Sequence, residues 1–151
     1  MPQHFEQRYL PYSPEHLFAL VADIESYPDF LPWCLGARII KRDGNIVTAD
    51  LIVGYKSFRE QFRSIVTLKA SELISVRYDG GALKHMKNEW CFMPGKTADE
   101  CNLTFYVDFS LRSSLLNGLM DMFFDKAFRK MVAAFEKRAA ETAQQFMTVP
   151  S

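Results

Sequence analysis

The stretch CNLTFYVDFSLRSSLLNGLMDMFFDKAFRKMVAAFEKRA, residues 101–139, changes its apolar period once, from that of a strand to that of a helix. In its first part every second residue is apolar: Leu103, Phe105, Val107, Phe109 and Leu111. This alternation predicts a strand with one buried face. From about 114 to 146 the apolar residues recur every three or four positions and form the stripe of a long helix: Leu116, Met120, Phe124, Phe128, Met131, Phe135 and Ala139. Because the apolar face of such a sheet must be buried against another element, this helix of roughly 30 residues is predicted to pack on that face.

The strand pattern extends back from residue 101 to about residue 35. Gly, Pro and polar breaks near 43–44, 54–57, 70–71, 80–81 and 94–95 divide it into about six strands. Links this short favour antiparallel hairpins, since a parallel crossover needs about a dozen residues or more. Alternate positions of each strand are apolar and the others mostly charged or hydroxylated, which indicates one buried and one wet face.

The N-terminal part adds one strand and two short helices. Residues 4–10 alternate, with Phe5, Gln7 and Tyr9 on one side, and predict a strand. Ser13 and Pro14 are a typical helix start, and the helix is predicted to cover about 14–24. Together these elements predict an α+β fold, in which an antiparallel sheet of about seven strands curves around the C-terminal helix.

Composition limits the class of protein. The 151 residues predict a single domain covering 1–151; 48% of them are hydrophobic and 13 are Phe. The formal net charge is +0, which gives no reason to expect a DNA partner. The cysteines, Cys34, Cys91 and Cys101, are odd in number and widely spaced, as free thiols of a reducing compartment are. With no apparent secretory signal and no apolar run long enough to span a bilayer, the chain is expected to be soluble and cytoplasmic.

Four segments in this order resemble one known family. They are VADIESYPDFLPWC (21–34), GYKSFREQFRSIVTL (54–68), GALKHMKNEWCF (81–92) and LLNGLMDMFFDKAFRKMVAAFEKRA (115–139). The chain is similar to the START-like, helix-grip proteins of the polyketide cyclase and lipid-transport superfamily, and within it to the coenzyme Q-binding proteins and their bacterial relatives.

The resemblance implies a hydrophobic tunnel that holds ubiquinone, or a similar isoprenoid lipid, as a bound ligand. It implies carriage of the quinone for respiration, with peripheral contact at the inner membrane, no other cofactor and no chemistry on the ligand. The same subfamily includes bacterial toxins that block association of ribosomal subunits, so a ribosomal role stays open. A basic helix face would suit that role: Lys126, Arg129, Lys130, Lys137 and Arg138. A polyketide cyclase-type activity is the third alternative.

The candidate pocket combines an apolar lining with a few polar groups. The apolar candidates come from the turn at 27–34, the strands and the wide apolar part of the last helix: Phe30, Leu31, Trp33, Phe58, Phe62, Trp90, Phe92, Phe105, Phe109, Met120, Phe123 and Phe124. Aromatic stripes often form plain core, so the case for a pocket is collective. Three polar residues interrupt the inward positions and are candidates to contact a headgroup: Glu60, Ser64 and Asn88. Each has the alternative of a structural hydrogen bond.

No catalytic residues are predicted. The three histidines, His4, His16 and His85, are dispersed, and no Cys/His pair, carboxylate dyad or metal-ligand spacing is evident. We therefore expect a binding protein without a metal site.

Overall fold

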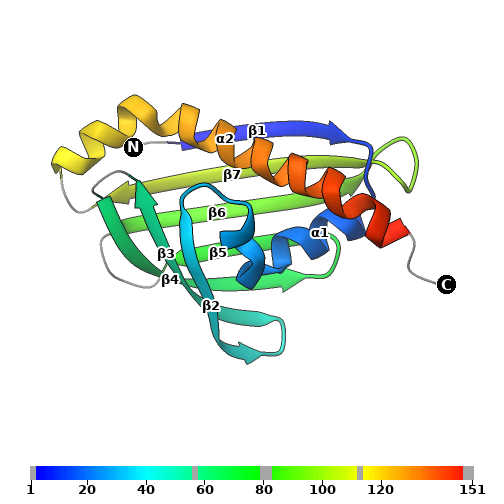
Figure 1. Ribbon diagram of the computed structural model, residues 1–151, viewed down its shortest axis with the longest axis horizontal. Helices are drawn as coiled ribbons and strands as arrows, with labels where there is room; N and C mark the ends of the chain where they lie inside the picture. Colours follow the sequence, from blue (N-terminus) through cyan, green and yellow to red (C-terminus); the bar gives the residue numbers. More distant parts are fainter. Residues whose placement is uncertain (1–2, 56–57, 79–82, 112–113, 148–151) are drawn as a thin grey trace.

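The computed structural model describes residues 3–55, 58–78, 83–111 and 114–147 and confirms the predicted order of elements (Figure 1). Within the last helix, side chains are described for 118, 126 and 128–143. The elements are β1 (Gln3–Leu10), α1 (Pro14–Ala22), the 3-10 helix η1 (Ile24–Asp29), β2 (Cys34–Asp43), β3 (Ile46–Tyr55), β4 (Phe58–Lys69), β5 (Leu73–Tyr78), β6 (Leu83–Pro94), β7 (Cys101–Leu111) and α2 (Ser114–Met147).

The strands form one antiparallel sheet in the order β1-β7-β6-β5-β4-β3-β2. Strands β2 to β7 are a meander, as their short links predict. The first strand completes the sheet beside the last one, with Gln3 opposite Asp108 and Leu10 opposite Cys101. In Figure 1, α2 runs along the sheet on the side of β1 and β7, and α1 lies near the C-terminal half of α2. We call the face of the sheet that carries α2 the inner face.

The helix that begins at Pro14 ends at Ala22, slightly earlier than predicted. Ser13 caps it, because its side chain accepts a hydrogen bond of 3.1 Å from the backbone N–H of His16. The chain then continues as the 3-10 helix η1, which includes Pro28. The Tyr27 hydroxyl donates to the carbonyl of Val21 and so ties η1 back to α1. These two elements are the pair of short helices that the sequence predicts.

The core lies between the inner face and the C-terminal half of α2. Buried apolar residues come from every strand and from the helices, and Phe92, Phe105, Ile74 and Val107 are almost fully enclosed. From α2, Val132, Phe135 and Ala139 are buried, at 2%, 5% and 0% exposure. The predicted apolar stripe of the helix is therefore confirmed where side chains are described.

Strand β1 turns its aromatic residues away from α2. Phe5 and Tyr9 are 63% and 74% exposed, whereas His4, Glu6 and Arg8 alternate with them on the inner face. The alternation predicted the strand correctly, but the side facing the helix is the polar one.

Candidate functional site

A small group of polar side chains interrupts the apolar inner face. Ser64 of β4 lies directly opposite Tyr78 of β5, and Asn88 of β6 lies opposite Val76, two residues before Tyr78. We call Ser64, Tyr78 and Asn88 the inner polar cluster. Ser64 is only 3% exposed and lies in the interior, whereas Tyr78 and Asn88 are half-buried and Tyr78 is the last residue of β5.

Two atoms of this cluster are buried without a hydrogen-bond partner among the described residues: Tyr78 Oη and Asn88 Oδ1. Leaving such a group unsatisfied costs about 1–3 kcal/mol, so its presence in an interior needs an explanation. The hydroxyl of Tyr78 can donate or accept. The amide of Asn88 can rotate to present either its oxygen or its NH₂ group. The cluster can therefore bind a molecule that carries hydrogen-bond acceptors, such as carbonyl oxygens.

Aromatic rings share the inner face with the cluster. Phe62 meets Tyr78 with ring centroids 5.7 Å apart, and Trp90 meets Phe105 at 4.4 Å. Phe128 of α2 then stacks on Phe105 at 6.0 Å. An apolar wall with few polar groups is the usual composition of a small-molecule site.

The aromatic turn predicted near 27–34 packs against the C-terminal half of α2. The Phe30 ring packs edge-on against Phe135 of α2 at 5.1 Å, and the Arg138 guanidinium lies 5.3 Å from its centroid. Leu31 is half-buried against the core. Trp33 is half-buried, and its carbonyl accepts a hydrogen bond of 2.9 Å from Gly54, which fixes the turn to β3. Whether this turn also gates a ligand stays a prediction.

The predicted pocket residues outside the turn fall into three groups. Phe62, Trp90, Phe105 and Phe109 lie together on the inner face, with Ser64 and Asn88 among them. Phe92 lies nearer α1, where it contacts Phe18 at 5.5 Å, and Glu60 is half-buried opposite Val53. The remaining four have side chains outside the described part of the structure: Phe58, Met120, Phe123 and Phe124.

The sequence-based prediction missed the polar role of Tyr78. Its position was counted with the apolar residues Ile74 and Val76 of the same strand, since all three share one face. The available signal was that a tyrosine on a buried face needs a partner for its hydroxyl.

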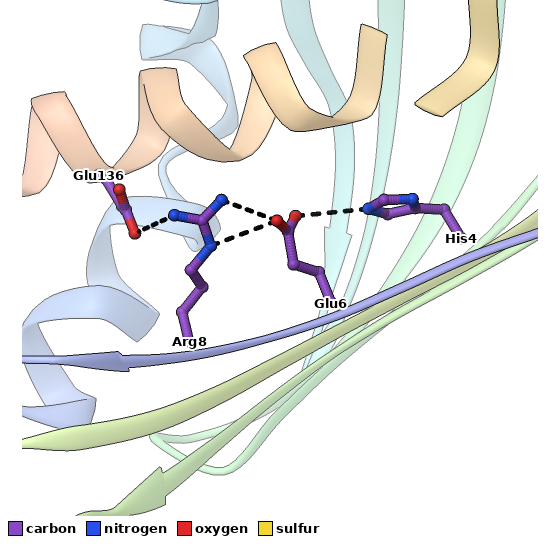
Figure 2. Close-up of polar contacts among 4 residues, drawn as sticks. All are labelled: His4, Glu6, Arg8 and Glu136. Atoms are coloured by element: carbon purple, nitrogen blue, oxygen red, sulfur yellow. Dashed lines mark hydrogen bonds and ion pairs between the residues drawn. The ribbon is translucent and has the colours of Figure 1, made fainter. Parts of the chain in front are cut away.

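A second polar group, also missed, links β1 to α2 (Figure 2). Arg8 Nη2 lies 2.7 Å from Glu6 Oε1 and Arg8 Nη1 lies 2.9 Å from Glu136 Oε1, while His4 Nε2 is 3.4 Å from Glu6 Oε2. The hydrogen bond to Glu6, together with both carboxylates, raises the pKa of Arg8. The guanidinium therefore stays charged and holds the strand to the helix.

This β1 group borders the inner polar cluster. His4, Val107, Asn88 and Val76 occupy one row across four neighbouring strands, which places His4 two strands, or about 10 Å, from Asn88. The His4 ring packs against Phe105 at 6.5 Å and Phe128 at 6.1 Å. The inner face thus becomes more polar toward β1.

Two of the cysteines, Cys34 and Cys101, are poorly suited to nucleophilic chemistry. Burial raises the pKa of Cys34 and raises that of Cys101 to about 11, which keeps both thiols protonated at neutral pH. Among the described residues, no three His, Cys, Asp or Glu side chains gather to hold a metal ion. None of the helices in the described ranges has the length and hydropathy needed to cross a bilayer.

Comparison with known sequences finds toxins and coenzyme Q-binding proteins among the relatives. Ribosome association toxin RatA of Rickettsia prowazekii (strain Madrid E) is 40% identical over 136 residues, which are 87% of this chain and 92% of that protein. Coenzyme Q-binding protein COQ10 homolog B, mitochondrial, of Xenopus laevis is 33% identical over 140 residues, which are 91% of this chain and 57% of that protein.

Solved structures share the fold. The Zhui aromatase/cyclase from Streptomyces sp. R1128 has a TM-score of 0.83 at 14% identity and covers 94% of this chain and 95% of its own. The 18 kDa protein CC1736 from Caulobacter crescentus has a TM-score of 0.76 at 34% identity, with 95% and 99% covered. The first shows the fold alone.

The family described as polyketide cyclase / dehydrase and lipid transport matches residues 10–136. The seven-stranded antiparallel sheet and its long C-terminal helix agree with this match. The chain therefore belongs to the polyketide cyclase / dehydrase and lipid transport family, with the START-like helix-grip fold, and its relatives there include coenzyme Q-binding proteins and ribosome association toxins.

Proposed function

We propose that this protein binds ubiquinone, or a similar isoprenoid lipid, between α2 and the inner face of the sheet, and that it carries this lipid without altering it. The observation that supports the proposal is the pair of buried, unpartnered polar atoms on Tyr78 and Asn88 within an aromatic wall. A relative at 33% identity is named a coenzyme Q-binding protein, which supports the same ligand class.

The ligand chemistry matches the site. A quinone ring carries carbonyl oxygens, which accept hydrogen bonds, and the Tyr78 hydroxyl and the Asn88 NH₂ group can both donate. The isoprenoid tail needs only apolar surface, and each CH₂ that it buries contributes about 0.8 kcal/mol. We place the tail along the aromatic wall, toward the N-terminal half of α2, where the sequence has its widest apolar surface.

The two tryptophans allow a direct test. Trp90 lies in the aromatic wall and Trp33 lies in the turn, so Trp33→Phe leaves one fluorophore at the proposed site. Titration with a short-tailed ubiquinone should quench Trp90 fluorescence in a saturable way. The converse variant, Trp90→Phe, is the matched control.

Native ligand is the second test. Protein purified gently from membrane-containing lysate should release, into hexane, a quinone that mass spectrometry identifies. Unsaturable quenching together with empty extracts would contradict the proposal. Replacing Glu60, Ser64 and Asn88 together by Ala should weaken quinone binding, and unchanged affinity would exclude these residues as headgroup contacts.

A ribosomal role is the second candidate, because a relative at 40% identity is named a ribosome association toxin. It predicts co-sedimentation with ribosomal subunits that weakens as salt is raised. Absence of such binding at low salt would remove this candidate. Catalysis ranks third, since the relatives reported above are named for binding or association and only the fold is shared with an aromatase/cyclase.

A further inference from the structure

The outer side of α2 carries a row of positive charges. Lys126, Arg129, Lys130 and Lys137 are all exposed, and their spacing of three, one and seven residues keeps them on one side of the helix, around exposed Ala133. We call these four cations the basic ridge. The buried stripe of Val132, Phe135 and Ala139 faces the sheet instead.

Within the described part of the chain, no carboxylate forms an ion pair with the basic ridge. Glu136, which adjoins Lys137 in sequence, is bound to Arg8 on β1, and the side chain of Asp125, which adjoins Lys126, lies outside the described residues. Arg138 is also turned away, since it lies over the Phe30 ring. Because the whole chain has a formal charge of +0, the ridge is a local asymmetry and not part of a general excess of cations.

Apolar surface adjoins these charges. An open depression of about 440 Å³ is lined by Lys126, Arg129, Lys130 and Ala133. A second, of about 430 Å³, shares Ala133 and is lined also by Leu10, Pro11, Tyr12, Glu136 and Lys137. Cations that alternate with small, apolar and aromatic groups are typical of surfaces that rest in the headgroup region of a bilayer.

The sequence just before the ridge is also rich in apolar residues, three of which, Met120, Phe123 and Phe124, are already candidates for the pocket. Residues 115–124 of α2 include seven apolar ones: Leu115, Leu116, Leu119, Met120, Met122, Phe123 and Phe124. The helix therefore changes along its length, from an apolar segment at 115–124 to the segment that carries the basic ridge. A surface that binds RNA needs the charge but not the apolar segment.

We propose that the basic ridge docks this protein on an anionic bilayer, with the outer side of α2 against the lipid phosphates. This inference rests on the proposed lipid carriage, for which it names the surface where lipid is collected and delivered. Each Lys or Arg beside an anionic membrane strengthens binding about fivefold. Lys126, Arg129 and Lys130 together should therefore strengthen membrane binding roughly 100-fold.

The test is sedimentation of the full chain with phosphatidylcholine vesicles, with and without phosphatidylglycerol. The wild type should bind the anionic vesicles, and salt should weaken that binding. The triple variant Lys126→Gln, Arg129→Gln, Lys130→Gln should bind them roughly 100-fold more weakly. All three side chains are exposed, so circular dichroism should show an unchanged fold.

A matched control removes the same charge elsewhere. Lys41, Arg42 and Lys96 are exposed on other parts of the surface, and their replacement by Gln should leave vesicle binding within about threefold of wild type. Equal binding of the wild type to neutral and anionic vesicles would overturn the proposal, as would a ridge variant that binds like the control.

Two further outcomes separate this proposal from the others. If the ridge variant loses vesicle binding but still binds short-tailed ubiquinone in detergent, docking is supported independently of the pocket. If no quinone binds while vesicle docking still depends on the ridge, carriage fails and docking stands. If the ridge substitutions abolish ribosomal co-sedimentation and leave vesicle binding intact, the ridge is an RNA surface and the membrane proposal is wrong.

Discussion

The Tyr78 hydroxyl provides the sharpest prediction, because its removal should change stability and ligand affinity in opposite directions. Tyr78 Oη is buried and has no partner among the described residues. Tyr78→Phe removes a desolvated group worth about 1–3 kcal/mol and keeps the ring that packs on Phe62. We therefore expect the free variant to be more stable by at least about 1 kcal/mol, which is roughly a 2–4 °C rise in Tm for a chain of this length.

The same change should weaken quinone binding. The hydroxyl is proposed to donate to a quinone carbonyl, and one neutral hydrogen bond contributes about 0.5–1.5 kcal/mol, or roughly two- to tenfold in Kd. Urea unfolding of the free protein and quenching of Trp90 in the Trp33→Phe background measure the two effects separately. Tyr9→Phe is the control, because Tyr9 is 74% exposed and should change neither quantity by more than about 0.5 kcal/mol.

The result that would refute this reasoning is a destabilised Tyr78→Phe variant. Such a loss would show that the hydroxyl is satisfied inside the free protein. It would then offer no unmet hydrogen bond to a ligand. A stabilised variant with unchanged quinone affinity would instead place the headgroup away from Tyr78.

Three other predictions concern the packing of α2. The side chains of Arg8 and Glu136 are 33% and 29% exposed, so a double-mutant cycle should give a coupling energy of only about 0.3–1 kcal/mol, which decreases as salt is raised. A larger coupling energy that does not change with salt would contradict this prediction. Burial lowers the pKa of His16, whose Nε2 lies 2.8 Å from Thr142 Oγ1, so the contribution of neutral His16 to stability is complete above about pH 6.5 and is lost as the pH falls through its folded pKa. The urea midpoint should therefore change less steeply with pH in His16→Gln than in the wild type. Equal slopes of midpoint against pH would exclude His16 as the cause. Phe135→Ala should lower the free energy of unfolding by about 3–5 kcal/mol and Phe135→Leu by clearly less, because the Phe135 ring packs against three other aromatic rings at 5.0–5.5 Å. Equal, small losses in the two variants would mean that this end of the core is loosely packed.

The sequence carried enough information to predict the fold, since the change of period at Leu111 and the turn signals are local. It was less informative about β1. Alternation defines two faces of a strand, but which face is buried depends on what covers it. Here a polar part of α2, through Glu136, meets Arg8, so the exposed side is the one with Phe5 and Tyr9.

The candidate site was predicted only as a region. Periodicity placed Phe62, Trp90 and Asn88 on the buried face, and the structure agrees. It could not show that Asn88 and Tyr78 would lack partners, because hydrogen-bond satisfaction depends on neighbours from other strands. Long-range contacts of this kind have no local signature in the chain.

The pairing of the first strand with the last one has a consequence for biosynthesis. Gln3 lies opposite Asp108 and Leu10 opposite Cys101, so β1 has no strand to join until most of the chain has been made. At about 5–20 residues per second, it waits roughly 5–20 s after its own synthesis. During that interval β1 is unpaired and can pair with strands of other chains. The sheet is therefore completed late, after the β2–β7 meander has been synthesised. Chaperone binding would matter most for this protein at that step.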